Sequence, residues 1–262
     1  MIDGHVHLEK GPLTVAYVME MVDAAVKMDI DTLQILDHTH RFHEFEPLYT
    51  TVKARHPLQA VWLAKKGKDS LLDYHRLIEQ VKALDLPIHV DFGLEVCYVP
   101  EAGPFLSDIL PAYPYDFIVG SVHSIDGWLY DMPFSQELLW QKQSTDAIYR
   151  RYYALVEQMM RSGLFTQIGH PDTIKLFDLW PAYDLQPTYE RLARLAKEKH
   201  LKMEDNTGCY YRYHTKDVGL NDAFLKCLLA CEVDIITASD AHYPRHVGAY
   251  LREAEAKIRA LS

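Results

Sequence analysis

The sequence lacks the features that identify secreted, membrane-spanning and disulfide-stabilised proteins. It has only four cysteines, none in a CxxC pair, and Cys227 and Cys231 are spaced one helical turn apart, as small buried side chains often are. No apolar run approaches the roughly 18 residues of a membrane-spanning helix. The first residues, Met1-Ile2-Asp3-Gly4-His5, show no basic segment followed by an apolar one. We therefore expect a soluble protein of the reducing cytoplasm.

Two common nucleotide-binding signatures are also missing, because no glycine-rich dinucleotide fingerprint and no Walker loop occur. The formal net charge is −10 with histidine neutral, which does not favour nucleic acid or an anionic membrane as a partner. The same charge would repel a phosphorylated substrate unless local cations reverse the field. Bound metal ions would do so.

Short β-branched runs alternate with longer amphipathic stretches along all 262 residues, and this alternation predicts parallel strands covered by helices. We expect one domain, 1–262, folded as a distorted (β/α)7 TIM-like barrel, with a doubly wound open sheet as the alternative. The polar and aromatic stretch 128–144 is expected to be a loop or lid over the site. The predicted strands are 1–8, 32–37, 88–96, 116–123, 165–169, 201–206 and 234–239. The predicted helices are 14–28, 70–84, 105–110, 144–162, 188–199, 220–231 and 247–260.

Polar residues end every predicted strand, and in parallel barrels these ends form the active site. A lone histidine at a strand end is more often a structural residue than a ligand. Here nearly every strand end carries a residue of a metal-ligand type, and this points to a metal site. His5 and His7 lie at i and i+2, on one face of a strand, and can hold one ion together. The metal-ligand candidates are His5, His7, Asp37, His38, Glu95, His123, His170, Asp240 and His242.

The number of these ligands exceeds the needs of one ion, so we expect two or three divalent ions. Imidazole and carboxylate ligands suit zinc, iron or manganese, and Glu95 or Asp240 can bridge two ions through its two oxygens. His40, His43 and His214 follow in loops near the mouth, where they could touch a substrate.

Together these segments resemble the polymerase and histidinol phosphatase (PHP) superfamily. The matching pieces are Asp3-Gly4-His5-Val6-His7, Leu36-Asp37-His38, Gly93-Leu94-Glu95, Gly120-Ser121-Val122-His123, Ile168-Gly169-His170 and Ser239-Asp240-Ala241-His242. Gly-Ser-Val-His, Arg161-Ser162-Gly163-Leu164-Phe165 and Asn206-Thr207-Gly208 resemble the histidinol-phosphate phosphatase branch.

The resemblance implies a metal cluster at the mouth of a seven-stranded barrel. His5 and His7 would hold one ion, bridged by Glu95 and Asp240, and His123 and His170 would complete a second. His38 and His242 would belong to a third. Family members often carry another histidine after the first pair, whereas this sequence has Leu8-Glu9-Lys10-Gly11-Pro12. Glu9 is therefore the candidate replacement ligand.

The implied reaction is hydrolysis of a small phosphomonoester, with L-histidinol phosphate in histidine biosynthesis as the leading substrate. Metal ions can lower the pKa of a water to about 7 and so provide a nucleophile at neutral pH. Glu95, Asp240 and His242 are the candidate catalytic residues. The candidates for binding substrate or phosphate are Arg161, Arg212, Arg245, Lys175 and His43.

Three other functions stay open from the sequence. The enzyme could act on another small phosphate or a nucleotide. An amidohydrolase-like enzyme could use the same cluster on a C–N bond, but it would normally need a carboxylated lysine on a strand, and no lysine lies among these strand ends. A non-catalytic module is the third, and the intact ligand set speaks against it.

Overall fold

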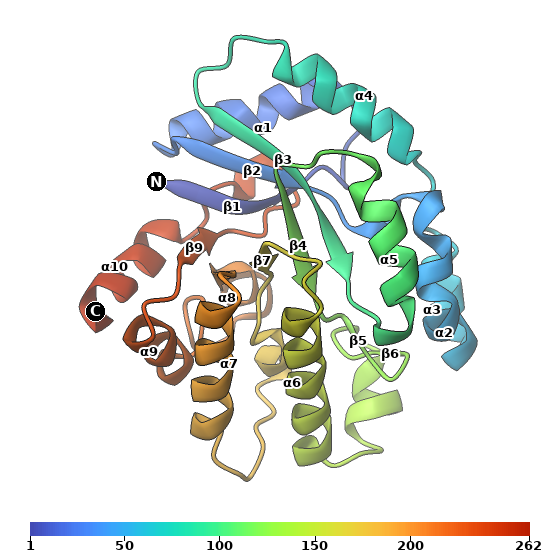
Figure 1. Ribbon diagram of the computed structural model, residues 1–262, viewed down its shortest axis with the longest axis vertical. Helices are drawn as coiled ribbons and strands as arrows, with labels where there is room; N and C mark the ends of the chain where they lie inside the picture. Colours follow the sequence, from blue (N-terminus) through green and yellow to red (C-terminus); the bar gives the residue numbers. More distant parts are fainter.

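A computed structural model describes all 262 residues of the chain. Seven parallel strands form one sheet in which each strand pairs with its neighbour in sequence order (Figure 1). These strands are β1 (Ile2–His7), β2 (Thr32–Leu36), β3 (His89–Cys97), β4 (Phe117–Ser121), β7 (Gln167–Ile168), β8 (Lys202–Asn206) and β9 (Ile235–Ala238). A separate antiparallel hairpin joins β5 (Ser124–Ile125) and β6 (Trp128–Leu129).

Helices surround this sheet, and most are amphipathic with one buried face. On α1, for example, the buried residues Val18, Met21, Val22 and Ala25 recur at helical spacing. The helices are α1 (Val15–Lys27), α2 (Thr50–Arg55), α3 (Pro57–Leu63), α4 (Leu71–Lys82), α5 (Gly103–Ile109), α6 (Thr145–Arg161), α7 (Gln186–Glu198), α8 (Gly208–Tyr213), α9 (Asp222–Ala230) and α10 (Leu251–Leu261). Short 3-10 turns are η1 (Thr39–Arg41), η2 (His43–Tyr49), η3 (Pro100–Ala102), η4 (Leu110–Ala112), η6 (Thr173–Phe177) and η7 (Pro244–His246), and η5 (Gln136–Trp140) is a π-helical turn.

The sheet is nearly closed into a barrel, because its first and last strands meet. His7 donates its backbone N–H to the carbonyl of Ala241 at 2.8 Å, just beyond β9. The fully buried carboxylate of Asp3 accepts hydrogen bonds from the backbone N–H and hydroxyl of Ser239 and from the N–H of Gly248. This closure confirms the predicted barrel and rules out the open doubly wound alternative.

The predicted strands and helices coincide with the observed ones apart from their ends, but three observed helices, α2, α3 and α8, have no predicted counterpart. Residues 43–63 form η2, α2 and α3, and the stretch 128–144 contains β6 and η5. Trp140 and Tyr130 are buried there, and the indole N–H of Trp140 donates to the Tyr130 carbonyl at 2.9 Å. Such aromatic packing follows no helical or strand period, so the sequence pattern could not reveal it.

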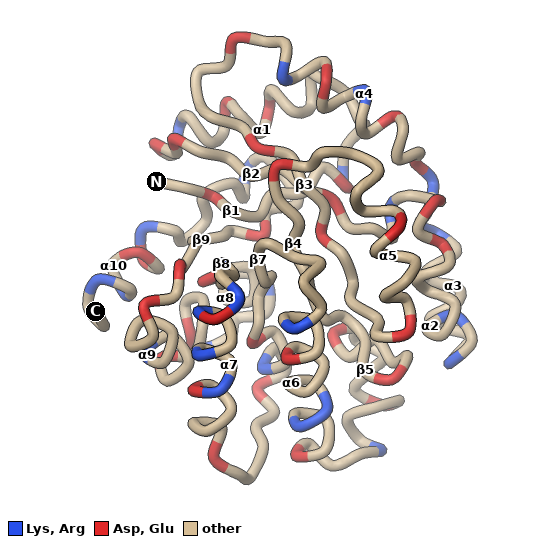
Figure 2. The backbone as a smooth tube through the Cα atoms, viewed as in Figure 1, with Lys and Arg blue, Asp and Glu red and all other residues tan.

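One hydrophobic cluster extends from Val6 to Leu251 and lies between the sheet and the helices. It is the arrangement expected of one domain, which stays a prediction. No helix is long and apolar enough to cross a membrane. Lysine and arginine are scattered over the outer helices and interspersed with acidic residues, not gathered on one face of this view (Figure 2).

Asp205, on β8, is a buried carboxyl on the outer side of the barrel. One of its oxygens accepts the N–H of Leu220 at 2.6 Å, and the other has no hydrogen-bond partner. Burial raises the pKa of Asp205 to about 6. A carboxyl whose folded-state pKa exceeds its unfolded value stabilises the fold when protonated, and this contribution is lost as the pH rises through the folded pKa.

The Asp205→Asn variant should therefore gain stability over the wild type as the pH rises. Because two units of pKa correspond to about 2–3 kcal/mol, the difference in unfolding free energy should grow by that amount between about pH 4 and about pH 7. Urea denaturation in a chelator, with the exposed Asp85→Asn as control, measures the difference. A constant difference across this range would contradict the raised pKa.

Candidate metal centre

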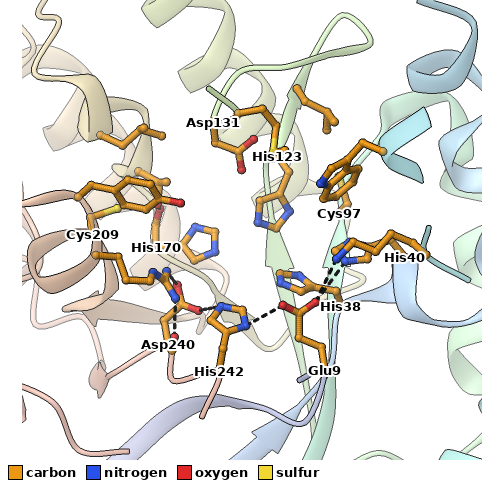
Figure 3. A pocket seen from close by; sticks show the side chains of 18 of the residues that line it. Glu9, His38, His40, Cys97, His123, Asp131, His170, Cys209, Asp240 and His242 are labelled. Carbon is orange, nitrogen blue, oxygen red and sulfur yellow. Dashed lines mark hydrogen bonds and ion pairs between the residues drawn. The ribbon is translucent and has the colours of Figure 1, made fainter. Parts of the chain in front are cut away.

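The carboxyl ends of the seven parallel strands meet at one mouth of the barrel, where imidazole and carboxylate side chains converge (Figure 3). Ten of them form five overlapping groups, and within each group the potential ligand atoms lie within 4.8 Å of one another. The ten residues are His5, His7, Glu9, His38, His40, Glu95, His123, His170, Asp240 and His242. Such density of ligands exceeds the needs of one ion.

The buried carboxylate of Glu95, on β3, lies at the centre of this mouth. Five imidazoles surround it: its Oε2 lies 2.5 Å from His38 Nδ1, 3.5 Å from His5 Nε2 and 3.6 Å from His7 Nε2, and its Oε1 lies 2.8 Å from His170 Nε2 and 3.3 Å from His123 Nε2. The two oxygens therefore face different histidines, which is the geometry of a bridging carboxylate.

His5 and His7 alternate with Val6 on β1, so both rings point into the barrel. Their Nε2 atoms lie 3.0 Å apart, and Asp240 Oδ1 lies 3.3 Å from His7 Nε2 and 4.0 Å from His5 Nε2. Two nitrogens bound to one tetrahedral ion at 2.0–2.1 Å would be about 3.3 Å apart. These three side chains thus have the separation of ligands that share an ion.

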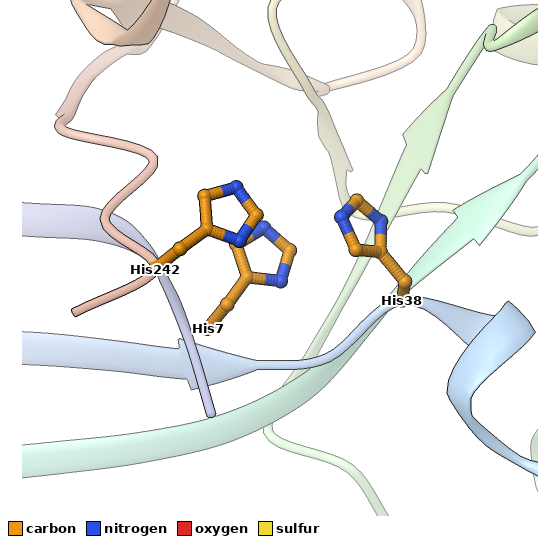
Figure 4. Close-up of side chains that lie close together, drawn as sticks. All are labelled: His7, His38 and His242. Atoms are coloured by element: carbon orange, nitrogen blue, oxygen red, sulfur yellow. The ribbon is translucent and has the colours of Figure 1, made fainter. Parts of the chain in front are cut away.

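A further group lies toward the solvent, where the His7 and His242 rings stack at 4.3 Å and the His7 and His38 rings at 4.2 Å (Figure 4). Glu9 adjoins it: its carboxylate lies 3.0 Å from His242 Nδ1 and 3.6 Å from His40 Nε2. Glu9 therefore occupies the region of the predicted third ion, together with His38 and His40.

Two of these residues have strained backbones. His170 and Asp240 have φ values of 28° and 54°, in the left-handed region that residues other than glycine seldom adopt. Such conformations cost on the order of 1–3 kcal/mol and concentrate at functional sites. Here they turn the chain sharply after β7 and β9, and both side chains join the cluster.

The buried carboxylate of Glu204, on β8, fixes two members of the cluster, His5 and His170, by hydrogen bonds. Its Oε1 accepts hydrogen bonds from His5 Nδ1 and Gln167 Nε2, both at 2.8 Å. Its Oε2 accepts from the backbone N–H of His170 at 3.0 Å and from Asn206 Nδ2 at 2.9 Å. Because His5 donates its Nδ1–H to this carboxylate, the lone pair on Nε2 of the same ring is available to bind an ion.

The electrostatics of the mouth keep its carboxylates ionised. Burial alone would raise the pKa of Glu95, but the imidazoles of His38, His123 and His5 outweigh burial and hold it well below its usual range. Burial likewise opposes ionisation of Asp240, yet the Arg212 guanidinium holds the pKa of that carboxyl well below its usual range. Both groups are therefore anions, the form that binds cations.

Several buried atoms in the mouth lack a hydrogen bond, and this supports a fit to metal ions. Glu95 Oε2, His7 Nδ1, His170 Nδ1 and His242 Nδ1 all have no aligned partner, although Glu95 Oε2 is close to several nitrogens. Buried polar atoms normally find partners, so such a concentration marks a place for ligands that the chain does not supply. Imidazole nitrogens with carboxylate oxygens are the donors of zinc, iron and manganese sites.

A cavity of about 370 Å³ opens above the cluster. Arg212 lines it, and its guanidinium donates to the backbone carbonyl of Asp240 at 2.6 Å and to Asp240 Oδ2 at 2.5 Å. Gly208 allows this approach, because a Cβ at that position would lie 2.6 Å from Arg212 Nη2 and 2.8 Å from Asp240 Cβ. Lys10, Lys66 and Asp131 also line the cavity.

Of the five residues expected to bind substrate or phosphate, the structure brings only Arg212 to this cavity. Arg161 ends α6 and binds Glu157 on the same helix, with half of its side chain exposed. The motif that suggested it therefore marks a helix end, not the site. Arg245 lies over the ring of Tyr243 and lines a different surface groove with residues of α1.

Two further residues expected to bind substrate also lie outside this cavity. Lys175 is buried and donates to Asp172 at 2.7 Å and to the Gly219 carbonyl at 2.6 Å, so its ammonium is used within the fold. His43 is mostly exposed and its Nδ1 lies 3.0 Å from the carbonyl of Asp69, away from the cavity. Lys175, His43 and Arg212 all follow strand ends, so this position in the sequence could not show which of them lines the cavity.

Asp37 was expected to be a ligand, but it belongs to none of the five groups. Its Oδ2 accepts a hydrogen bond from Arg41 at 2.6 Å, and its Oδ1 lies 3.7 Å from His7 Nδ1. It stands behind His7, on the side of the ring that faces away from Asp240. The structure therefore places Asp37 as a neighbour of a ligand candidate.

Sequence reasoning missed two residues that a pattern could have revealed. His40 follows His38 at i+2, the same spacing that singled out His5 and His7, but it was assigned only to possible substrate contact. Glu204 is a carboxylate inside a buried strand, which is rare without a partner. Lys10 and Lys66 lie outside regular spacing, so nothing in the sequence marked them, and Asp131 was included only in the loop or lid expected over the site, 128–144.

Comparison with known proteins decides the family. The model of the PHP domain family matches residues 3–208. The chain belongs to the PHP domain family. This confirms the resemblance drawn from its strand-end motifs. A curated relative from Deinococcus radiodurans, named a probable histidinol-phosphatase, is 31% identical over 174 residues. That match covers 66% of this PHP chain and 65% of the relative, so the chain spans just under two thirds of that protein.

Two solved structures share the fold of this PHP protein. One, from Listeria monocytogenes and provisionally assigned as the histidinol phosphatase HisK, has a TM-score of 0.74 at 19% identity, covering 95% of this chain and 98% of that one. The other is the histidinol phosphate phosphatase of Lactococcus lactis in complex with zinc, L-histidinol and phosphate. Its TM-score is 0.68 at 15% identity, covering 100% of this chain and 93% of that one.

Replacing Glu204 by glutamine should weaken metal binding without removing any ligand. The amide would turn an NH2 group toward two N–H donors, so His5 would lose its fixed orientation. Loss of such supporting contacts typically lowers metal affinity about 10- to 100-fold. Competition with a chelator measures the affinity, with the exposed Glu198→Gln as control. Equal affinities in the wild type and Glu204→Gln would contradict this role.

Proposed function

We propose that this PHP protein hydrolyses a small phosphomonoester, with L-histidinol phosphate, split into L-histidinol and phosphate, as the leading substrate. The main support for this proposal is the cluster of ten potential metal ligands beneath a cavity that Arg212 lines. The names of the relatives agree with it, since the curated one is a probable histidinol-phosphatase and one solved relative holds L-histidinol and phosphate. Such a reaction would belong to histidine biosynthesis.

The ligand groups divide the metal-binding work. His5, His7 and Asp240 would hold one ion, His5, Glu95 and His170 a second, and His38 would join Glu95 and His123 or Glu9 and His40. Two or three divalent ions, of zinc, iron or manganese, would fit these donors. Bound there, they would supply the Lewis acidity that activates a water and neutralises phosphoryl charge.

Arg212 is the residue proposed to bind the phosphoryl group. Its guanidinium has five N–H donors, of which two are used on Asp240. A quarter of the side chain is exposed where it lines the cavity, so it can donate to non-bridging phosphate oxygens. Because Asp240 fixes the guanidinium, binding phosphate needs little ordering of the side chain.

Asp240 and His242 are proposed to handle the proton that the leaving alkoxide requires. His242 lines the cavity, and its Nε2 lies 3.2 Å from Asp240 Oδ1. A proton shared between these atoms could pass to the ester oxygen as the P–O bond breaks. Glu95 would act by orienting the surrounding imidazoles and ions.

Two of the alternatives find less support in the geometry. An amidohydrolase-like site needs a lysine among its ligands, whereas the cavity lysines Lys10 and Lys66 lie on loops and contact Glu9 at 2.8 and 3.4 Å. A non-catalytic module has no need for a cavity above an assembled ligand cluster. A PHP phosphoesterase acting on another small phosphate or a nucleotide shares every feature described so far, and a substrate panel separates it.

The purified protein should release phosphate from L-histidinol phosphate, lose this activity on chelation, and regain it with Zn²⁺, Fe²⁺ or Mn²⁺. The His7→Ala variant should bind less metal and lose at least about 100-fold in kcat/KM, because the ions provide most of the catalysis. The exposed His89→Ala is the matched control. Metal content is measured by mass spectrometry and phosphate release by a colorimetric assay. Unchanged metal and activity in His7→Ala would refute the assignment.

A further inference from the structure

Three carboxylates line the cavity above the metal centre: Glu9, Asp131 and Asp240. Glu9 contacts Lys10 at 2.8 Å, and Asp240 contacts Arg212 at 2.5 Å. Asp131 forms no ion pair, and no side chain donates a hydrogen bond to it, although the other two find cations within the chain. It is thus the one carboxylate of the cavity that the protein leaves without a partner.

The backbone around Asp131 is firmly held, so its position is built into the fold. Tyr130 is completely buried, and its hydroxyl donates to the Val122 carbonyl at 2.8 Å. The Tyr130 carbonyl accepts hydrogen bonds from Ser135 Oγ at 2.6 Å and from Trp140 Nε1 at 2.9 Å. A side chain carried by such a segment is pre-organised for a ligand.

The preceding hairpin is fixed in the same way. The buried amide of Gln59 accepts the N–H of Leu129 and donates to the Gly127 carbonyl, both at 2.8 Å. In Figure 3 the Asp131 carboxylate projects into the cavity beside His123, whereas Glu9 and His242 lie on the far side of the cluster. The cavity therefore has at one end a carboxylate without a cationic partner, and Arg212 and the ligand cluster also line it.

Asp131 is half-buried, and a carboxylate partly removed from water with no cation beside it costs free energy. Burial accordingly raises the pKa of Asp131, and the nearby His123 only partly offsets this. A cationic group that enters the cavity would remove this cost and gain a strong charge-assisted hydrogen bond. No lysine or arginine of the chain is placed to do so, since Lys10, Lys66 and Arg212 are bound to other carboxylates.

We propose that Asp131 binds an ammonium group on the alcohol part of the substrate, and so selects phosphomonoesters of amino alcohols. The inference rests on the proposed phosphatase function and adds the residue that recognises the alcohol part of the substrate. The phosphoryl end would lie over the ligand cluster near Arg212, and the amine would reach Asp131 at the rim. Uncharged sugar phosphates and nucleotides would leave this carboxylate unpaired and bind more weakly.

The test compares two esters whose leaving alcohols differ only in the amine: L-histidinol phosphate, and its deamino counterpart imidazolylpropyl phosphate. In Asp131→Asn, kcat/KM for the amino ester should fall about 10- to 100-fold, mainly through a higher KM, as for loss of a charged hydrogen bond. The deamino ester should change less than about threefold. Asp126→Asn is the matched control, since Asp126 lies in the hairpin that precedes Asp131 but pairs with Arg151 on the surface.

Two results would overturn the inference. Equal losses for both esters would show that Asp131 acts in proton transfer or only in structure, and no loss for either would show that it contacts no substrate. Melting temperature and metal content, measured for each variant, exclude misfolding as the cause of a loss.

A binding arm keeps the inference separate from the proposed function. L-Histidinol should bind the metal-loaded wild type and bind Asp131→Asn at least about tenfold more weakly by calorimetry, whether or not any phosphoester is hydrolysed. If no ester is hydrolysed but this difference is found, the phosphatase proposal fails and the ammonium site stands. Equal binding, or no binding to the wild type, would overturn the ammonium site alone.

Discussion

The buried carboxylate of Glu95 is the interaction on which the mouth of the barrel depends. Five imidazoles from four other strand ends converge on its two oxygens, and no other side chain has that position. A buried anion is tolerated only where charge compensates it. Protonated histidines could do so one at a time, but five rings cannot all be charged at such distances. Divalent ions between the carboxylate and the rings would satisfy every member at once, which explains why so many buried nitrogens lack partners.

The rest of the fold supplies rigidity to that arrangement. Glu204 accepts four hydrogen bonds, two of which align His5 and the backbone of His170, and Asp3 joins the first strand to the turn after the last one. Both carboxylates are completely buried, so each costs free energy that its donors must offset. These contacts connect strands that are distant in sequence. Buried carboxylates therefore both close the barrel and orient the ligands.

Much of this could be predicted from the sequence, because strand ends and i, i+2 spacing are local properties. They located β1, β9 and the ligand candidates His5, His7 and Asp240, and the structure brings these together. The cationic residues could not be sorted in this way. Arg212 and Lys175 both follow strand ends. The Arg212 guanidinium pairs with Asp240 at the cavity, whereas the Lys175 ammonium pairs with Asp172 in the interior of the fold. The carboxylate that a long cationic side chain contacts depends on the tertiary structure, which residue spacing in the sequence does not reveal.

The central role of Glu95 is tested most directly by the position of the metals relative to its carboxylate. A crystal structure of the metal-loaded protein, with anomalous scattering recorded at the absorption edge of each bound element, would locate them. We expect at least two ions, each within about 2.0–2.3 Å of a different Glu95 oxygen and shared with the surrounding histidines. Ions bound elsewhere, or a single ion that does not touch Glu95, would contradict this expectation.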